Sequence, residues 1–409
     1  MKHIAILGGG PVGLEAALAA AQAGLPFTLY EAAYEVAGNV RSWGHVQLFT
    51  PWSMNVSPRV REALEAAGHD VPDGDDCPIG SALVERVFEP LAKLPELAPH
   101  IRCDHRVIEI GRDGLLKSDE IGTGARSSSR FRLLVRDGGG AEFVEFADIV
   151  LDCTGTYDNP NALGVGGVRA PGEAQAAEYI IRQIPDFDAP LLSGDAPGWG
   201  GLRILLVGSG HSAQTAARDL AGLIVRVPET RVTWAIRSKD PTFGAVPDDT
   251  LPVRHALVEQ ARGLASDDSP FDVRLGYSVD ALEASPEGIV VTLVHADGSR
   301  DTVTVDRIIS LTGAVGDARM YRQLQVHECY ATSGPMKLAA ALLASTSADC
   351  LTQESQGADT LKNPEPDFYI LGMKSYGRNS SFLMRVGWEQ VNEVFSLIET
   401  AEPAVEGQS

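Results

Sequence analysis

The residues with the clearest chemical meaning are three glycines near the start of the chain. Gly8, Gly10 and Gly13 have G-x-G-x-x-G spacing and follow the apolar run Ile4 to Leu7. In this pattern the first glycine permits a tight strand-to-helix turn, the second lets a pyrophosphate approach the backbone, and the third lets the helix lie close to the strand. The N-terminus of the following alanine-rich helix would offer N–H groups and a positive dipole end to phosphates.

An acidic residue strengthens this interpretation. A second apolar run, Pro26 to Tyr30, ends at Glu31, which lies 18 positions past Gly13. An acid at this place binds the ribose hydroxyls in dinucleotide-binding folds. A glycine-rich turn in some other α/β unit would not explain the acid. We therefore predict a dinucleotide site at this turn, with Pro11 and Val12 as further contacts.

The same pattern occurs a second time, with the opposite charge at its end. The apolar run Leu202 to Val207 leads into Gly208, Ser209, Gly210, His211 and Ser212, and the next apolar run ends at Arg237-Ser238-Lys239. Basic side chains at this point accommodate a 2′-phosphate, whereas an acid binds a free ribose. We predict NADPH at the second turn; the alternative is that Arg237 is an ordinary surface residue.

Each glycine turn is followed by short alternating runs that predict three strands. They span residues 101–110, 130–136 and 142–146 in the first copy, and 279–283, 289–295 and 301–305 in the second. A buried strand then ends in Thr154-Gly155 and in Thr312-Gly313. The sequence predicts an α/β fold with two Rossmann-like dinucleotide-binding domains, each with a three-stranded β-meander insertion.

The domain boundaries follow from the positions of these patterns. We predict a first domain in residues 1–170, a connection at 171–201 that holds a helix from Glu173 to Gln183, a second domain at 202–316, and a return to the first domain at 317–409. The stretch Lys117 to Ser129 is polar and rich in glycine and serine, which predicts a mobile loop. Ser81 is predicted to cap the N-terminus of a helix.

An irregular segment after Glu31 carries many large side chains. Trp43, His45, Phe49, Trp52 and Met54 lie within twelve positions of a chain with only 6% aromatic residues. Loops on a rigid α/β scaffold commonly carry the functional site, so this segment is a candidate lining for a flat aromatic cofactor. The alternative is a loop that covers the core.

Composition excludes several classes of partner. The net charge of −21 disfavours nucleic acids and anionic membrane surfaces, and no apolar run reaches the length of a membrane span. The first strand begins too early to leave room for a signal peptide, so we expect a cytoplasmic protein. The five cysteines, Cys77, Cys103, Cys153, Cys329 and Cys350, form no C-x-x-C motif. We expect inert thiols and no metal site.

These features together resemble the two-dinucleotide-binding-domain flavoproteins, and among them the flavin-containing monooxygenases and N-hydroxylases. Gly38 to Trp43 is similar to their G-G-x-W segment, and Gly208 to Ala213 is similar to their NADPH fingerprint. Leu371-Gly372-Met373 lacks the Gly-Asp of the disulfide reductases. Two departures are Asn39, in place of a second glycine, and the absence of the F-x-G-x-x-x-H signature between the domains.

The resemblance implies FAD at the first turn, NADPH at the second, and molecular oxygen and a small molecule as further reactants. It implies a monooxygenase that oxygenates a soft nitrogen or sulfur centre through a C4a-peroxyflavin. The cofactor contacts that it adds are Gly38, Arg41, Trp43, Val107, Thr154, Gly155, Gly313, Gly372 and Met373. The predicted catalytic residues are His45, Asn55 and Arg378, and the predicted substrate pocket is Phe49, Trp52, Met54 and Tyr376.

Two other functions share these motifs. One is a reductase or dehydrogenase that passes electrons to a quinone, a metal complex or a protein. The other is a flavoprotein sensor without turnover. The sequence leaves the substrate and the oligomeric state open, with a homodimer as one option.

Overall fold

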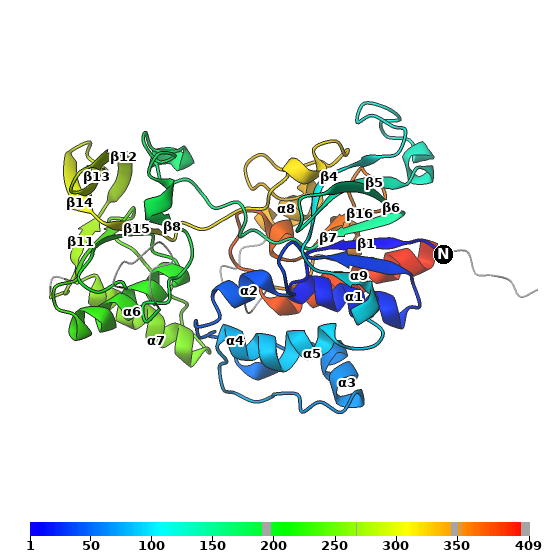
Figure 1. Cartoon of the computed structure of the whole chain (residues 1–409), viewed down its shortest axis with the longest axis horizontal. Helices are drawn as coiled ribbons and strands as arrows, with labels where there is room; N and C mark the ends of the chain where they lie inside the picture. The colour runs from blue at the N-terminus through cyan, green and yellow to red at the C-terminus, as the bar shows by residue number, and fades with distance from the viewer. Residues whose placement is uncertain (190–197, 267, 345–350, 352, 402–409) are drawn as a thin grey trace, which may run out of the picture. The chain divides into compact units, whose positions relative to one another are not determined.

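A computed structural model describes residues 1–189, 198–266, 268–344, 351 and 353–401 of the chain (Figure 1). The chain forms two compact units. The first contains residues 1–44, 51–159 and the chain from 314 onward, and the second contains residues 45–50 and 160–313. The predicted connection at 171–201 falls within the second unit in this division, and Cys350 lies outside the described residues.

The first unit is built on a five-stranded parallel sheet. The strands are β1 (Ile4–Leu7), β2 (Phe27–Tyr30), β3 (Ile101–Arg102), β7 (Ile149–Asp152) and β16 (Phe368–Ile370), in the order β16-β7-β1-β2-β3. Every residue of β1, β2 and β7 is buried, as expected for parallel strands that are covered on both faces. Strand β16 pairs with β7, so the C-terminal part of the chain contributes a strand to the first sheet.

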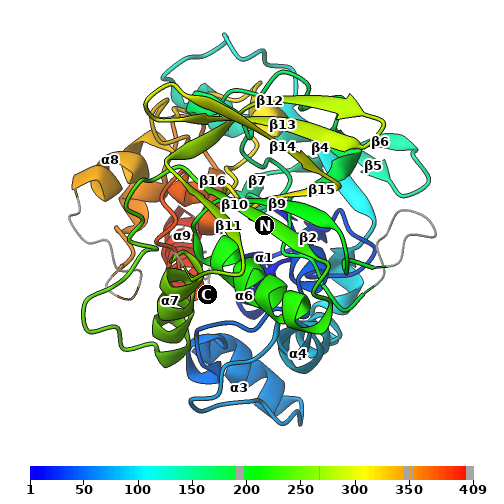
Figure 2. The same ribbon diagram turned by 90° about the vertical axis from the view of Figure 1, so that its left-hand side faces the viewer.

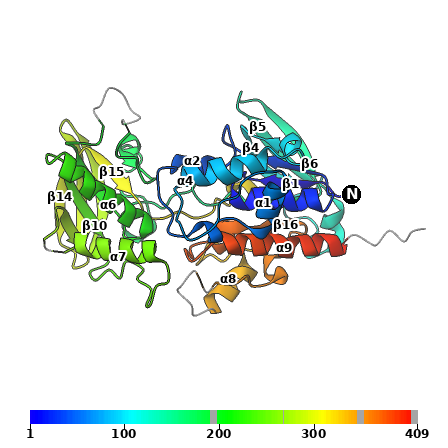
Figure 3. The ribbon, with the colours of Figure 1, turned by 90° about the horizontal axis from the view of Figure 1, so that it is seen from below.

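Helices and a β-meander cover this sheet. Helix α1 (Pro11–Gln22) packs against α9 (Met384–Ala401), as Figure 3 shows. The meander consists of β4 (His105–Arg112), β5 (Phe131–Asp137) and β6 (Glu142–Ala147), and its side chains share a core with Ala5 and Leu7 of β1.

Short helices complete the first unit. They are α2 (Gly38–Ser42), α3 (Pro58–Ala66), α4 (Gly80–Leu83), α5 (Glu89–Ala92) and α8 (Met336–Ala344). Ser81 lies inside α4, whose N-cap is Ile79, so the predicted capping role of Ser81 is wrong. The chain enters the helix at Gly80, where a β-carbon would lie 2.8 Å from the ring of Trp43. Packing against Trp43 therefore fixes the start of this helix.

The second unit repeats the arrangement. Its parallel strands are β8 (Ile180–Ile181), β9 (Arg203–Val207), β10 (Arg231–Ile236), β11 (Asp272–Leu275) and β15 (Arg307–Ser310), in the order β11-β10-β9-β15-β8. Helices α6 (His211–Arg226) and α7 (Pro252–Leu264) pack together (Figure 2). The meander is β12 (Tyr277–Ser285), β13 (Gly288–His295) and β14 (Arg300–Val305). The predicted fold class, with its two meanders, is confirmed.

The predicted helix from Glu173 to Gln183 is wrong. This stretch contains a 3₁₀ turn at Ala177–Tyr179 and then β8. The carboxylate of buried Glu173 accepts hydrogen bonds from the backbone N–H groups of Leu163 and Ala170, which holds the chain in a loop. Strand β8 then pairs with β15 at the edge of the sheet, and this tertiary pairing overrides the local helical preference.

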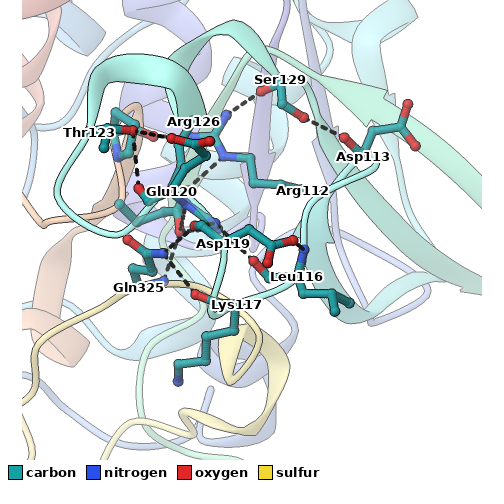
Figure 4. Close-up of polar contacts among 12 residues, drawn as sticks. Arg112, Asp113, Leu116, Lys117, Asp119, Glu120, Thr123, Arg126, Ser129 and Gln325 are labelled. Atoms are coloured by element: carbon teal, nitrogen blue, oxygen red, sulfur yellow. Dashed lines mark hydrogen bonds and ion pairs between the residues drawn. The ribbon is translucent and has the colours of Figure 1, made fainter.

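The connection between β4 and β5 is anchored, although its composition predicts a mobile loop. It contains a 3₁₀ helix at Gly124–Ser128, which carries Arg126 (Figure 4). The buried guanidinium of Arg126 lies 2.9 Å from the carboxylate of Glu365. Arg112 contacts the same carboxylate at 2.7 Å. Arg126 also donates to the carbonyls of Leu116 and Asp119, so the loop is tied to the body of the first unit.

None of the described helices is long and apolar enough to cross a membrane.

Candidate functional site

The first glycine turn connects β1 to α1 at the carboxyl end of the sheet. A β-carbon at Gly8, where φ is +96°, would lie 2.8 Å from the carbonyl oxygen of Cys153, and one at Gly13 would collide with the carbonyl of Gly8. A β-carbon at Gly10, in contrast, would meet nothing within 4 Å. Gly10 is also the N-cap of α1, and no side chain caps the helix there. The turn therefore presents an uncapped helix N-terminus with open space beside Gly10, which suits a phosphate.

Glu31 lies directly beside this turn. Its carboxylate accepts hydrogen bonds from the backbone N–H of Gly9 at 2.6 Å and of Ala33 at 2.8 Å. Burial raises the pKa of Glu31, and the two backbone amides oppose this shift. Each oxygen keeps lone pairs beyond these bonds, so the carboxylate is able to accept further hydrogen bonds from hydroxyl groups.

Three of the cofactor contacts that the resemblance implies lie near this turn, and each of these residues contacts other parts of the protein. The guanidinium of Arg41 lies 2.8 Å from Glu89 and 3.3 Å from Glu35. A β-carbon at Gly38 would collide with Ala33, and Trp43 packs against Gly80. These contacts place the three residues close to the chain that follows Glu31, and their contact with a cofactor stays a prediction.

A buried ion pair at the carboxyl end of β7 was missed by the sequence reasoning. The Nζ atom of Lys374 lies 2.6 Å from Asp152 and donates to the hydroxyl of Thr154 at 3.1 Å. Thr154 in turn donates to the other Asp152 oxygen, through its hydroxyl at 2.7 Å and its backbone N–H at 3.1 Å. The only sequence signal is an acid at the end of an apolar strand, two residues before the predicted Thr154-Gly155.

Gly372, Met373 and Val107 have separate surroundings. The backbone N–H of Gly372 donates to the side chain of Gln390 at 2.8 Å, and a β-carbon at Gly372 would lie 3.2 Å from Val12 of the first turn. Met373 follows within the 3₁₀ helix Gly372–Tyr376. Val107 packs against the core shared by β1 and the meander. The structure thus brings Gly372 to the first turn, while Val107 belongs to the meander.

The predicted catalytic and pocket residues are divided between the two units. His45 and Phe49 belong to the second unit, whereas Trp52, Met54, Asn55, Tyr376 and Arg378 belong to the first. The Asn55 amide donates to the carbonyl of Pro51 at 2.9 Å. The buried ring of Tyr376 packs edge-on against Phe382, and its hydroxyl has no hydrogen-bond partner among the described residues. Arg378 is exposed, and its backbone N–H donates to the carbonyl of Thr332. A common pocket for these residues stays a prediction.

The second glycine turn has the same construction. A β-carbon at Gly208, where φ is +126°, would collide with the carbonyl of Leu311, whereas one at Gly210 would meet nothing within 4 Å. Gly210 is the N-cap of α6, again with no side-chain cap. The Trp234 indole donates to the carbonyl of Gly208 at 2.8 Å, and the Gln214 amide donates to that of Ser209 at 2.9 Å. These side chains hold the turn in shape.

Five predicted residues lie on the segments around this second turn. Arg237 and Ser238 are exposed at the carboxyl end of β10, and Ser212 is exposed in the first turn of α6. Gly313 has a φ of +83°, and the preceding carbonyl of Thr312 accepts a hydrogen bond from Asn161. The imidazole of His211, which begins α6, lies against Phe49 with 5.1 Å between ring centroids.

The described cysteines are all free thiols. They are Cys77, Cys103, Cys153 and Cys329. Burial raises the pKa of Cys153, whose carbonyl lies against Gly8 of the first turn, so this thiol stays protonated. Within the described ranges of the chain, no group of three or more histidine, cysteine or acidic side chains is placed to hold a metal ion.

Comparison with known proteins bears on the fold. No protein-family model matches the chain, and no curated protein resembles it in sequence. The solved structures that are similar include bacillithiol disulfide reductase from Bacillus cereus, with 17% identity and a TM-score of 0.68, which covers 98% of this chain and 99% of that one. They also include ornithine hydroxylase from Pseudomonas aeruginosa, with 15% identity, a TM-score of 0.63 and coverage of 98% and 100%.

The chain has the fold of the two-dinucleotide-binding-domain flavoproteins. A flavin monooxygenase from Stenotrophomonas maltophilia is also similar, with 18% identity, a TM-score of 0.56 and coverage of 97% of this chain and 100% of that one. Reductases and monooxygenases therefore share this flavoprotein fold, so the fold does not decide between the two activities.

Proposed function

We propose that the protein is an FAD-dependent oxidoreductase that takes its electrons from NADPH. The observation that carries this proposal is the pair of uncapped glycine turns, one followed by Glu31 and the other by Arg237. The residues fit the cofactors, because Gly10 and Gly210 have open space where a β-carbon would point. An ornithine N-hydroxylase from Kutzneria, whose structure is similar to this chain, was solved with reduced FAD and NADP⁺.

The chain's own residues would bind and orient the two cofactors. Glu31 would accept hydrogen bonds from the ribose hydroxyls of FAD while it keeps its bonds to Gly9 and Ala33. Arg237 and Ser238 would bind the 2′-phosphate of NADPH, since both are exposed at the end of β10. Bound flavin supplies hydride acceptance and either oxygen activation or electron transfer.

Within this class we propose oxygenation of a small molecule at a soft nitrogen or sulfur centre. The chain has no C-x-x-C motif, and burial keeps Cys153 protonated. The first turn therefore offers no reactive pair of thiols that could pass electrons from the flavin to a disulfide. The likeness to ornithine hydroxylase and to a flavin monooxygenase supports the same direction. His45, Asn55 and Arg378 remain proposed catalytic residues.

The second candidate is a reductase that passes electrons to an external acceptor. It is favoured by the likeness to bacillithiol disulfide reductase, which extends over 98% of this chain with a TM-score of 0.68. This activity needs the same two cofactors. It differs from oxygenation only in the acceptor that takes electrons from the reduced flavin.

Product analysis during NADPH turnover tests the proposal. The FAD-loaded protein is given NADPH and oxygen with a panel of amines, thiols and ketones, and oxygen and NADPH consumption are measured with the products. A monooxygenase yields one hydroxylated or S-oxygenated product for each NADPH and each oxygen molecule consumed. NADPH oxidation that depends on a disulfide, quinone or metal complex, without oxygenated product, would instead establish the reductase.

A further inference from the structure

The imidazole of His211 is enclosed by two other segments of the second unit. Phe49 lies against one side of the ring, with an angle of 60° between the ring planes. A β-carbon at Gly244 would lie 3.8 Å from Nε2 of His211. Phe243 and Gly244 both have positive φ values, +55° and +70°, so the backbone bends sharply here. The Gln214 amide donates to the carbonyl of Phe243 at 2.8 Å and ties this bend to α6.

The enclosed ring carries an unsatisfied polar atom. Nε2 of His211 is buried and has no hydrogen-bond partner among the described residues. Leaving a buried polar atom without a partner costs about 1–3 kcal/mol. His211 is also the first residue of α6, whose N-terminus has no side-chain cap. Nε2 is a donor when the ring carries its proton there or is charged, and an anion would then give an acceptor both to Nε2 and to the helix N-terminus.

The surroundings of the ring favour its neutral form while no anion is bound. Burial lowers the pKa of His211, and the nearby Arg254 lowers it further, whereas Asp249 raises it. Arg254 and Asp249 are themselves paired at 2.7 Å, and burial is the largest cause of the lowered pKa. On the segment that carries Phe49, the nearest titratable side chain in sequence is His45, which is exposed.

We infer that His211 binds a phosphate oxygen of NADPH through Nε2 and takes up a proton as the cofactor binds. This inference rests on the proposed NADPH site at the second glycine turn. Phe49 is a positioning residue, because its contact fixes the orientation of the imidazole. A bound phosphate favours the charged form of the ring, so the pKa of His211 rises in the complex. Affinity for the cofactor is then higher at low pH and falls as pH rises through the pKa of the complex.

Proton-linked calorimetry tests the inference without turnover. The FAD-loaded protein is titrated with NADP⁺ between pH 6 and 8.5 in two buffers of different ionisation enthalpy. The wild type is expected to take up as much as one proton, and its affinity to fall as much as about tenfold per pH unit. His211→Gln keeps an amide donor but does not titrate, so its uptake is expected to fall to the contribution of the 2′-phosphate, which titrates near pH 6 in both proteins.

Two further variants and one spectrum complete the test. Phe49→Leu removes the ring contact, and weaker binding with proton uptake retained is expected. His255→Gln is the matched control, because His255 is exposed on α7; it is expected to behave as the wild type. In the wild type, the ring carbon-13 NMR signals of His211 are expected to move from the neutral to the charged position when NADP⁺ is added at pH 7.

Each outcome decides a different point. Equal proton uptake in the wild type and His211→Gln would overturn the role of His211 while leaving the NADPH site in place. A His211 NMR signal that stays neutral with NADP⁺ bound would do the same without any variant. Failure of the wild-type protein to bind NADP⁺ at any pH would overturn the proposed cofactor site and this inference together.

Discussion

The two glycine turns share their backbone but differ in the charge around them. In each, one glycine is pressed against the neighbouring strand end, at Cys153 or at Leu311, while the middle glycine faces open space. The first turn is closed by the acid Glu31, whose carboxylate is bound to the backbone of Gly9. The second is followed by exposed basic residues and begins its helix with His211. The common backbone indicates a common ligand group, and the charge indicates which dinucleotide each turn prefers.

The strand ends next to the two turns also differ in charge. Register places Asp152 of β7 beside Leu7, and Ser310 of β15 beside Val207, so the two residues are structural equivalents. Asp152 is paired with buried Lys374, whereas the hydroxyl of Ser310 lies 3.5 Å from that of Thr312. One copy of the fold therefore maintains its strand end with a buried ion pair and the other without one.

The largest effect is expected from breaking that ion pair. Lys374→Met leaves Asp152 buried without its counter-charge, and removing one partner of a buried pair typically costs about 3–5 kcal/mol. Amide hydrogen exchange of β1 and β7 would report this loss of local stability in the first unit.

The second unit supplies the control for this experiment. Asp152→Ser combined with Lys374→Met copies the Ser310 arrangement and removes both charges. Replacing a buried pair by neutral residues is often nearly neutral, so most of the lost stability is expected to return. A double variant as unstable as Lys374→Met would show that the unpaired charge of Asp152 is not the cause of the lost stability.

A smaller effect is expected from adding a methyl group within the first turn. Gly13→Ala places a β-carbon against the carbonyl of Gly8, and such overpacking costs about 1–3 kcal/mol. Gly10→Ala meets nothing within 4 Å, so the fold is expected to persist while bound FAD is lost. Thermal unfolding and the flavin absorbance of the purified proteins separate the two effects. Full flavin content in Gly10→Ala would contradict phosphate binding at this turn.

Much of the fold was predictable because the patterns repeat. Buried parallel strands give continuous apolar runs, and Gly8 and Gly208 each mark a strand-to-helix turn. The repeat also fixed the order of the meanders and the following strands. Residues 173–183 were wrongly predicted as a helix, because pairing with β15 at the sheet edge is a long-range contact that no local pattern reveals.

The site was less predictable wherever it depends on side chains from distant segments. Lys374 and Asp152 are 222 positions apart, and Arg126 and Glu365 are 239 apart, so neither pair has a sequence signature. The aromatic segment after Glu31 was interpreted as a candidate cofactor lining or a loop over the core, and residues 45–50 within it belong to the second unit. Composition identified the segment as unusual, and only the fold shows where the chain crosses between units.

The smallest effect is expected at the basic end of the second turn. Arg237→Glu puts a carboxylate where the 2′-phosphate of NADPH is proposed to bind, and the preference for NADPH over NADH is expected to fall about tenfold, or ~1.4 kcal/mol. The effect is modest because Arg237 is exposed, and solvent screens charges there. Arg231→Glu is a matched control, since Arg231 is exposed at the opposite end of β10. Steady-state kcat/KM with the two cofactors measures the change. An unchanged preference for NADPH over NADH in both Arg237→Glu and Arg231→Glu would show that the charge difference between the turns does not select the cofactor.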